Sequence, residues 1–169
     1  MLIAMIVAMD EDEVIGDNNG LPWELSSDMA RFKSLTEGNG HNAVIMGRKT
    51  WKSLPDKFRP LPSRVNIVMS KDSGWKEDGA ESALYPGRAI EIAYSNACEE
   101  CWIIGGSQIY DLFFDSVTEI HVTRVHTNNS GQIFFPTWNR EQWIEEVFEK
   151  NEKNDNDDFD TTYSIWKKK

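Results

Sequence analysis

The chain has 169 residues, of which 40% are hydrophobic and 11% aromatic, and this is typical of one globular domain over residues 1–169. Its 28 acidic and 18 basic residues give a formal net charge of -10. Such a charge repels nucleic acid and anionic lipid, so we expect no nucleic-acid or membrane partner, although a local basic pocket for a small anion is compatible with it.

The chain starts with MLIAMIVAMDEDEV, whose apolar run is too short to cross a bilayer. No Lys or Arg precedes the run and acidic residues follow it at once, which is unlike a secretory signal. We therefore interpret residues 2–9 as a buried strand and expect a cytoplasmic protein.

Two cysteines, Cys98 and Cys101, have the C-x-x-C spacing that can mark a redox centre or half of a zinc site. The pair follows an expected helix and precedes an expected strand, whereas a redox pair usually follows a strand. There is no second pair to complete a zinc site, and the three histidines are scattered. The sequence favours two reduced thiols and no metal.

Short apolar runs alternate with segments of helical character. We expect strands at residues 2–9, 43–46, 65–69, 82–85, 101–104 and 119–125, and helices at 27–35, 50–54, 87–96 and 107–114. The expected strands are almost continuously apolar, which indicates that helices cover both faces of their sheet. This alternation is typical of an α/β domain with a mostly parallel central sheet.

The last third of the chain differs in character. Residues 143–150 and 161–168 look like two strands, and the acidic segment NEKNDNDDFD joins them. Strands joined in this way pair antiparallel, so we expect a mixed sheet with an antiparallel C-terminal hairpin. We call residues 151–160 the hairpin segment and interpret it as a mobile, solvated tip.

The stretch GLPWELSSDMARFK, residues 20–33, begins as a turn and continues as a helix that Ser26 or Ser27 could cap. Asp28 lies three residues after Leu25 and four before Phe32, so it falls on or beside the apolar face of this helix. The carboxylate could simply complement the helix dipole, which would contribute about 0.3–1 kcal/mol.

The apolar surroundings of Asp28 favour a second interpretation. A desolvated carboxylate costs several kcal/mol unless it is paired, and we expect Arg31 and Lys33 to point elsewhere. A distant segment could supply the partner, or a planar ligand whose adjacent N–H groups donate two parallel hydrogen bonds. The preceding DEDEVIGDNNGLPW, which we call the lid segment (residues 10–23), is either a lid over this carboxylate or an ordinary surface loop.

Two strand-to-helix junctions are candidate phosphate sites. WIIGGSQIYDLFF places Gly105 and Gly106 where backbone N–H groups can approach an anion, or where a tight turn is needed. AVIMGRKTW places Arg48 and Lys49 at a helix start, as phosphate ligands or as surface charges. Both junctions lie at carboxyl ends of parallel strands, so a ligand with two separate phosphate groups, such as NADPH, would use both. Arg64 could anchor a carboxylate or face solvent.

Together these segments resemble dihydrofolate reductases of the short, monomeric bacterial type. The matching stretches are IVAMDEDEVIGDNNGLPW, LSSDMARFKSLT, VIMGRKTWKSL, RPLPSRVNIVMS, WIIGGSQIY and IHVTRV, spread over nearly the whole chain. The resemblance implies reduction of 7,8-dihydrofolate to tetrahydrofolate with NADPH, by hydride transfer to pterin C6 and protonation of N5. It also implies a monomer that binds antifolates such as methotrexate or trimethoprim.

The resemblance assigns roles to single residues. Asp28, supported by Thr123, would hold the pterin 2-amino group and N3, with Leu21 and Trp23 as lid residues beside the rings. The other implied substrate-binding residues are Ile6, Ala8, Phe32, Leu54, Ile104 and Tyr110, with Arg64 for the glutamate α-carboxylate. The implied cofactor-binding residues are Ala8, Ile15, Gly47, Arg48, Lys49, Thr50, Ser70, Lys71, Gly105, Gly106, Ser107 and Gln108. The family has an unusual cis bond between the two glycines of this turn.

Three residues depart from some bacterial members of the family. Leu21 stands where some have Met, Lys49 where some have His, and Gln108 where some have Arg. The departures at Lys49 and Gln108 bear on the contacts with the cofactor, and so on the strength of its preference for NADPH over NADH.

The implied mechanism gives Asp28 the task of orienting and polarising the pterin. A carboxylate paired with N3 is too far around the ring to reach N5, so a water admitted by the lid would deliver the proton. Burial should raise the pKa of Asp28, and hydride transfer should then slow at high pH.

Two other functions stay open from the sequence. One is the related NADPH-dependent pyrimidine reductase of riboflavin synthesis, although the helix with Asp28 and Arg64 favour folate. The other is a non-catalytic nucleotide-binding module, against which the acid, the two junctions and the lid segment all argue.

Overall fold

The computed structural model describes residues 1–128 and 130–169. Its helices are α1 (Ser26–Glu37), α2 (Arg48–Ser53), α3 (Pro86–Ser95) and α4 (Ser107–Phe113), with short 3-10 turns at Asp56–Phe58, Phe114–Ser116 and Arg140–Gln142. Its strands are β1 (Leu2–Met9), β2 (Val14–Gly16), β3 (Asn42–Gly47), β4 (Arg64–Met69), β5 (Glu81–Ala83), β6 (Glu100–Gly105), β7 (Glu119–Val125), β8 (Ile133–Phe134), β9 (Trp143–Asn151) and β10 (Thr161–Lys168).

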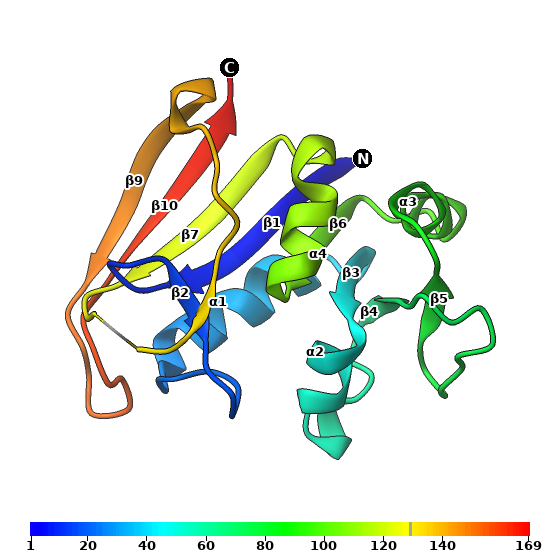
Figure 1. Ribbon diagram of the computed structural model, residues 1–169, viewed down its shortest axis with the longest axis horizontal. Helices are drawn as coiled ribbons and strands as arrows, with labels where there is room; N and C mark the ends of the chain where they lie inside the picture. Colours follow the sequence, from blue (N-terminus) through cyan, green and yellow to red (C-terminus); the bar gives the residue numbers. More distant parts are fainter. Residues whose placement is uncertain (129) are drawn as a thin grey trace.

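Eight of these strands form the central sheet, in the order β5-β4-β3-β6-β1-β7-β10-β9. The pairs from β5 through β7 are parallel, and β10 pairs antiparallel with both β7 and β9. Figure 1 shows the β9–β10 hairpin at one edge of the sheet and β5 at the other. The predicted fold class, a mostly parallel mixed sheet with an antiparallel C-terminal hairpin, is confirmed.

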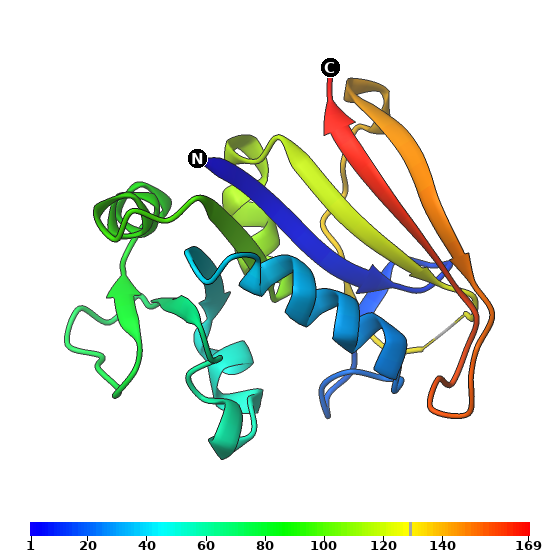
Figure 2. The same cartoon turned by 180° about the vertical axis from the view of Figure 1, so that it is seen from behind.

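Helices cover both faces of the sheet, as predicted. The core cluster with residues of α3 and α4 also takes Ala43 and Ile45 from β3, while the cluster with residues of α1 and α2 takes Val44 and Met46. Successive side chains of a strand point to opposite faces, so β3 is buried on both sides. Figure 1 shows α4 in front of the sheet, and Figure 2 shows α1 on the opposite face.

The two strand-to-helix junctions lie next to each other at the carboxyl ends of the central parallel strands. β3 and β6 are neighbours, and their register places Met46 beside Gly105. A Cβ added to Gly47 would lie 3.1 Å from the Ile109 side chain and 3.9 Å from the Gly105 carbonyl oxygen. Both junctions therefore present their backbone to the same region, as expected for the carboxyl ends of adjacent parallel strands.

Cys98 and Cys101 are free thiols buried in the cluster that α3 and α4 cover. Burial raises the pKa of Cys101 to about 12, which suppresses the thiolate that redox chemistry and metal binding need. Within residues 1–128 and 130–169, no group of three or more His, Cys, Asp or Glu side chains could hold a metal ion. None of the described helices is both long and apolar enough to span a membrane.

The lid segment contains a strand that the sequence did not predict. β2 pairs antiparallel with β8 in a separate two-stranded sheet, so residues 10–23 are not purely a loop. Val14 is 1% exposed, and Phe134 is its register partner. A strand of only three residues, surrounded by turn-forming residues, has no recognisable local pattern. Its pairing partner also lies far along the chain, so the sequence could not predict it.

The hairpin segment is largely exposed, as predicted for a solvated tip, but it also contacts the start of α1, which the sequence did not predict. Asp157 accepts hydrogen bonds from the Ser27 backbone N–H at 3.0 Å and from the Ser27 hydroxyl at 2.8 Å. The residue before the helix is Leu25, and no local side chain caps it. The predicted cap at Ser26 or Ser27 is wrong, because a distant carboxylate takes that role.

Asp157→Ala should lower the free energy of unfolding at neutral pH by about 1 kcal/mol, because the first turn of α1 loses its acceptor. The backbone hydrogen bond from Ser27 is the main cause that lowers the pKa of Asp157 below 3.8. The contribution is thus present above pH 3.8 and lost as the pH falls through the folded-state pKa.

Urea unfolding at neutral and at strongly acidic pH measures this contribution. Asp155→Ala is the control, because it removes the same charge from an exposed neighbour in the hairpin segment. Equal stability of the two variants at neutral pH would contradict the capping role of Asp157.

Candidate active site

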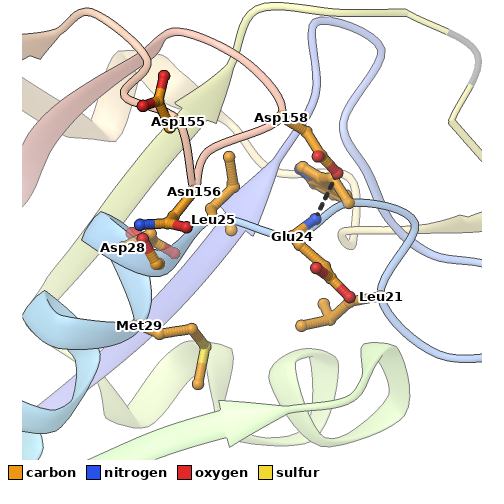
Figure 3. Close-up of a pocket in the computed structure, with 11 residues that line it drawn as sticks. Leu21, Glu24, Leu25, Asp28, Met29, Asp155, Asn156 and Asp158 are labelled. Atoms are coloured by element: carbon orange, nitrogen blue, oxygen red, sulfur yellow. Dashed lines mark hydrogen bonds between the residues drawn. The ribbon is translucent and has the colours of Figure 1, made fainter.

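A cavity of about 680 Å³ opens between the end of the lid segment, the start of α1 and the hairpin segment. Figure 3 shows Leu21, Asp28 and Met29 around it, with Asn156 and Asp158 contributed by the hairpin segment. The full lining is Ala8, Leu21, Trp23, Glu24, Leu25, Ser26, Asp28, Met29, Asp155, Asn156 and Asp158. Four of the predicted site residues share this wall, namely Ala8, Leu21, Trp23 and Asp28.

Asp28 lies in the first turn of α1, with a side chain that is 20% exposed. The Thr123 hydroxyl donates a hydrogen bond of 2.5 Å to its Oδ1 atom, so the predicted supporting contact is present. Thr123 is held there by β7, where it is the register partner of Ala8 on β1. Burial raises the pKa of Asp28 above 3.8, against the opposing effects of the Thr123 hydrogen bond and the Arg31 charge.

Arg31 does not point away from Asp28, and in this the sequence-based expectation is wrong. Its Nη1 atom lies 3.7 Å from Asp28 Oδ1, and its Nη2 atom donates a hydrogen bond of 2.7 Å to Glu149 Oε2. Residues three apart on a helix are neighbours, so the backbone permits this contact. The acid on β9 that draws the guanidinium inward could not be placed from the sequence.

The remaining predicted substrate residues lie deeper or farther along α1 than the cavity wall. Ile6, Phe32, Leu54 and Ile104 are partly buried and pack against one core cluster. Tyr110 is buried, and its hydroxyl donates a hydrogen bond of 2.8 Å to the Ile6 carbonyl oxygen. The structure thus brings four of these side chains together on the α1 face of the sheet, whereas Tyr110 of α4 packs in the core cluster of the opposite face.

Arg64 lies near the far end of α1. It donates hydrogen bonds of 2.9 Å to Thr36 Oγ1 and of 2.8 Å to the Pro62 carbonyl oxygen. Thr36 follows Asp28 by eight residues on the helix, which corresponds to about 12 Å along its axis. A ligand that touches both Asp28 and Arg64 must therefore be elongated.

Several lining residues were missed from the sequence. Leu25 and Met29 lie on either side of Asp28 in the sequence and are four residues apart, a helical spacing that was a usable signal. Asp155, Asn156 and Asp158 carried none, because their position depends on contacts across the whole domain. The Glu24 backbone N–H donates a hydrogen bond of 2.7 Å to Asp158 Oδ2, drawn as a dashed line in Figure 3. This bond makes the hairpin segment part of the cavity wall.

The β6–α4 junction offers an open stretch of backbone. Gly105 and Gly106 are joined by a cis peptide bond, as the resemblance implied. Apart from Gly106 itself and its two chain neighbours, no described residue has an atom within 4 Å of where a Gly106 Cβ would stand. The Ser107 hydroxyl donates a hydrogen bond of 2.7 Å to the Phe134 carbonyl oxygen and so ties α4 to β8.

The β3–α2 junction carries an unsatisfied cation. The Arg48 guanidinium lies 5.8 Å from the centre of the Trp75 ring, and its buried Nε atom has no hydrogen-bond partner within the described part of the chain. A buried N–H without an acceptor is costly, and a phosphate oxygen would satisfy it. These residues therefore fit the anionic groups of NADPH.

The other predicted cofactor residues are more loosely placed. Lys49, Lys71 and Gln108 are exposed and Thr50 is half-buried, whereas Ile15 packs against the core. The Ser70 hydroxyl makes two hydrogen bonds with the Asp72 backbone. It donates to the carbonyl oxygen and accepts from the N–H, both at 3.1 Å.

The family model for dihydrofolate reductase matches residues 2–168. The chain belongs to the dihydrofolate reductase family. The dihydrofolate reductase of Staphylococcus haemolyticus is 37% identical over 169 residues, covering 98% of this chain and 95% of that protein. The dihydrofolate reductase of Bacillus subtilis is 33% identical over 168 residues, covering 99% of this chain and 95% of that protein. The dihydrofolate reductase of Neisseria meningitidis serogroup A is 41% identical over 143 residues, covering 85% of this chain and 84% of that protein.

A solved structure of the same family has a closely similar fold. Dihydrofolate reductase from Enterococcus faecalis, complexed with NADP(H) and RAB-propyl, matches with a TM-score of 0.83 and 26% sequence identity, covering 99% of this chain and 96% of that one. The known reaction of dihydrofolate reductases is the NADPH-dependent reduction of 7,8-dihydrofolate to tetrahydrofolate.

Asp28→Asn should raise the free energy of unfolding of this dihydrofolate reductase family member at neutral pH, because it removes a charge that burial disfavours. The folded-state pKa of Asp28 lies above the unfolded value of 3.8. Between these two values the native state binds more protons than the unfolded state, so stability falls as the pH rises through this window. Asparagine removes the charge and keeps an acceptor for Thr123.

Urea unfolding of both proteins, at neutral pH and below pH 3.8, measures the effect. The difference should be largest at neutral pH and should disappear in acid. A variant that is less stable than its parent at neutral pH would contradict this prediction. It would show that other groups of the protein fully offset the cost of burying the Asp28 charge.

Proposed function

We propose that this chain reduces 7,8-dihydrofolate with NADPH at the cavity lined by Asp28. The observation that carries the proposal is a carboxylate in the cavity wall that is largely removed from water, with Thr123 on one oxygen. Such a group gains most from a ligand that offers adjacent N–H donors, and the 2-amino group and N3 of a pterin are such donors. The two anion-compatible junctions at the same edge of the sheet support a dinucleotide partner.

Asp28 fixes and polarises the pterin ring in this proposal. Leu21 is 65% exposed at the cavity wall, and it is free to cover a ring that enters. Trp23 is 5% exposed, and its buried Nε1 has no hydrogen-bond partner among the described residues. That N–H can hold a water at the edge of the cavity, and a water there delivers the proton to N5.

Arg64 binds the glutamate α-carboxylate. Its hydrogen bond to Thr36 fixes the guanidinium about 12 Å along α1 from Asp28, which suits the length of a folate. Between the two ends, the aromatic and aliphatic side chains Ile6, Phe32, Leu54, Ile104 and Tyr110 contact the rings.

NADPH, when bound, supplies the hydride. Gly105, Gly106, Ser107 and Gln108 take its pyrophosphate, and the open backbone at Gly106 supports this assignment. Arg48, with Ser70 and Lys71, meets the 2′-phosphate, and the unsatisfied Arg48 Nε supports that contact. The remaining contacts are with Ala8, Ile15, Gly47, Lys49 and Thr50.

The family resemblance also supports a cytoplasmic monomer that binds methotrexate or trimethoprim. The central sheet takes strands from Leu2 to Lys168, which supports a single domain over residues 1–169.

The purified protein should oxidise NADPH when dihydrofolate is added, and methotrexate should abolish the reaction. Asp28→Asn should still bind folate analogues but lose activity at neutral pH by about a hundredfold or more, because the polarising charge is gone. Absorbance of NADPH measures both outcomes.

Asp155→Asn is the matched control, because it neutralises another acid of the same cavity wall and should keep near-normal turnover. An absence of methotrexate-sensitive oxidation in the parent protein would overturn the proposed function. Near-normal turnover of Asp28→Asn would overturn only the role given to Asp28.

A further inference from the structure

Arg31 lies on α1 one turn after Asp28 and is held by two other elements. Its Nη2 atom donates a hydrogen bond of 2.7 Å to Glu149 on β9. Its guanidinium carbon lies 4.3 Å from the centre of the Tyr163 ring on β10, a cation–π contact. The side chain is 15% exposed, so the cation has little freedom to leave this position.

The ring that supports Arg31 is itself fixed. The Tyr163 hydroxyl lies 2.6 Å from His121 Nδ1, and His121 Nε2 lies 3.0 Å from Glu119 Oε2. Burial raises the pKa of Tyr163 to about 12, so the ring stays neutral. The support behind the cavity is thus a connected polar network on β7, β9 and β10.

The other end of the guanidinium faces Asp28. Nη1 lies 3.7 Å from Asp28 Oδ1, which is too long for a hydrogen bond but close enough for a strong effect of charge. Nη1 is also buried, without a hydrogen-bond partner in the described residues. Arg31 is not among the residues that line the cavity, so it acts on the carboxylate from behind.

We infer that Arg31 is a positioning residue that acts through Asp28. Held by Glu149 and Tyr163, its charge fixes the pH range in which Asp28 is a carboxylate that can accept both N–H donors of a pterin. This inference rests on the proposed function for its link to the reaction, but the contact itself does not depend on any ligand.

Among the residues that the structure describes, the other groups that act on Asp28 do not supply a cation. Asp157 of the hairpin segment raises the pKa of Asp28 and so works against Arg31, while the Thr123 hydroxyl of β7 lowers it. Tyr110 of α4 is held neutral by burial and by the nearby Asp28 charge. The acids that share the cavity wall with Asp28 are Glu24, Asp155 and Asp158.

A carboxyl titration of Asp28 in the ligand-free protein tests the inference. The ¹³C carboxyl signal of Asp28 is the one that Asp28→Asn removes. Arg31→Met should move its titration midpoint upward by about one pH unit, the low end of what an opposite charge within 4–6 Å does. Arg31→Lys keeps the charge and should restore most of the parent midpoint.

Lys33→Met is the matched control, because it removes a cation from an exposed position two residues along the same helix. Its midpoint should equal that of the parent protein. Glu149→Gln should move the midpoint the opposite way, downward, because the amide oxygen still accepts from Arg31 Nη2 while a negative charge beside the guanidinium is removed. Shifts in opposite directions cannot come from a general loosening of the fold. If Arg31→Met does not fold, the midpoints of Glu149→Gln and Arg31→Lys still test the inference.

Equal midpoints for Arg31→Met and Lys33→Met, or an upward shift for Glu149→Gln, would overturn the inference. Single-turnover hydride transfer then tests the link to catalysis, and its pH inflection should move with the carboxyl midpoint. A midpoint shift with no change in the inflection would overturn the positioning role. A parent protein that does not reduce dihydrofolate would overturn the proposed function, while the carboxyl titration still decides the Arg31–Asp28 contact.

Discussion

A carboxylate held largely out of water is the constraint on which the site depends. Desolvation disfavours the charged form of Asp28, so its surroundings decide whether the group is ionised at neutral pH. The Thr123 hydroxyl and the Arg31 guanidinium favour the ionised form, and Asp157 disfavours it. These groups belong to β7, to α1 and to the hairpin segment, so a working site requires that all three are assembled correctly.

The hairpin segment links the stability of the domain to the electrostatics of the site. Asp157 caps α1 through Ser27, and Asp158 holds the Glu24 backbone at the end of the lid segment. The carboxylate that stabilises the helix start is therefore also a negative charge near Asp28. Changes in this segment are expected to affect both folding and the protonation of Asp28, although the segment contains no residue assigned to bind substrate.

The parts of the fold that depend on local pattern were predictable. β1, β7 and β10 begin and end where they were predicted, and no helix end differs from expectation by more than two residues. The junctions at Gly47 and Gly105 were also recognisable, because a glycine between an apolar run and a helix is a local signal. The family resemblance added Thr123, whose contact with Asp28 has no signature in spacing.

The parts that depend on distant contacts were not predictable. The pairing of β2 with β8, the capping of α1 by Asp157 and the inward turn of Arg31 toward Glu149 all join segments far apart in the chain. In each case the local sequence suggested the more ordinary outcome: a loop, a serine cap or an arginine facing solvent. From the local sequence alone, a charged residue that makes a tertiary contact cannot be distinguished from one that only faces solvent.

A crystal structure of the protein with folate and NADP⁺ bound would test the central claim most directly. We expect both Asp28 oxygens within hydrogen-bond distance of the pterin 2-amino group and N3, with Thr123 still bonded to the carboxylate. We also expect the cofactor pyrophosphate against residues 105–108. A pterin bound without contact to Asp28, or a dinucleotide that avoids both strand-to-helix junctions, would contradict this account.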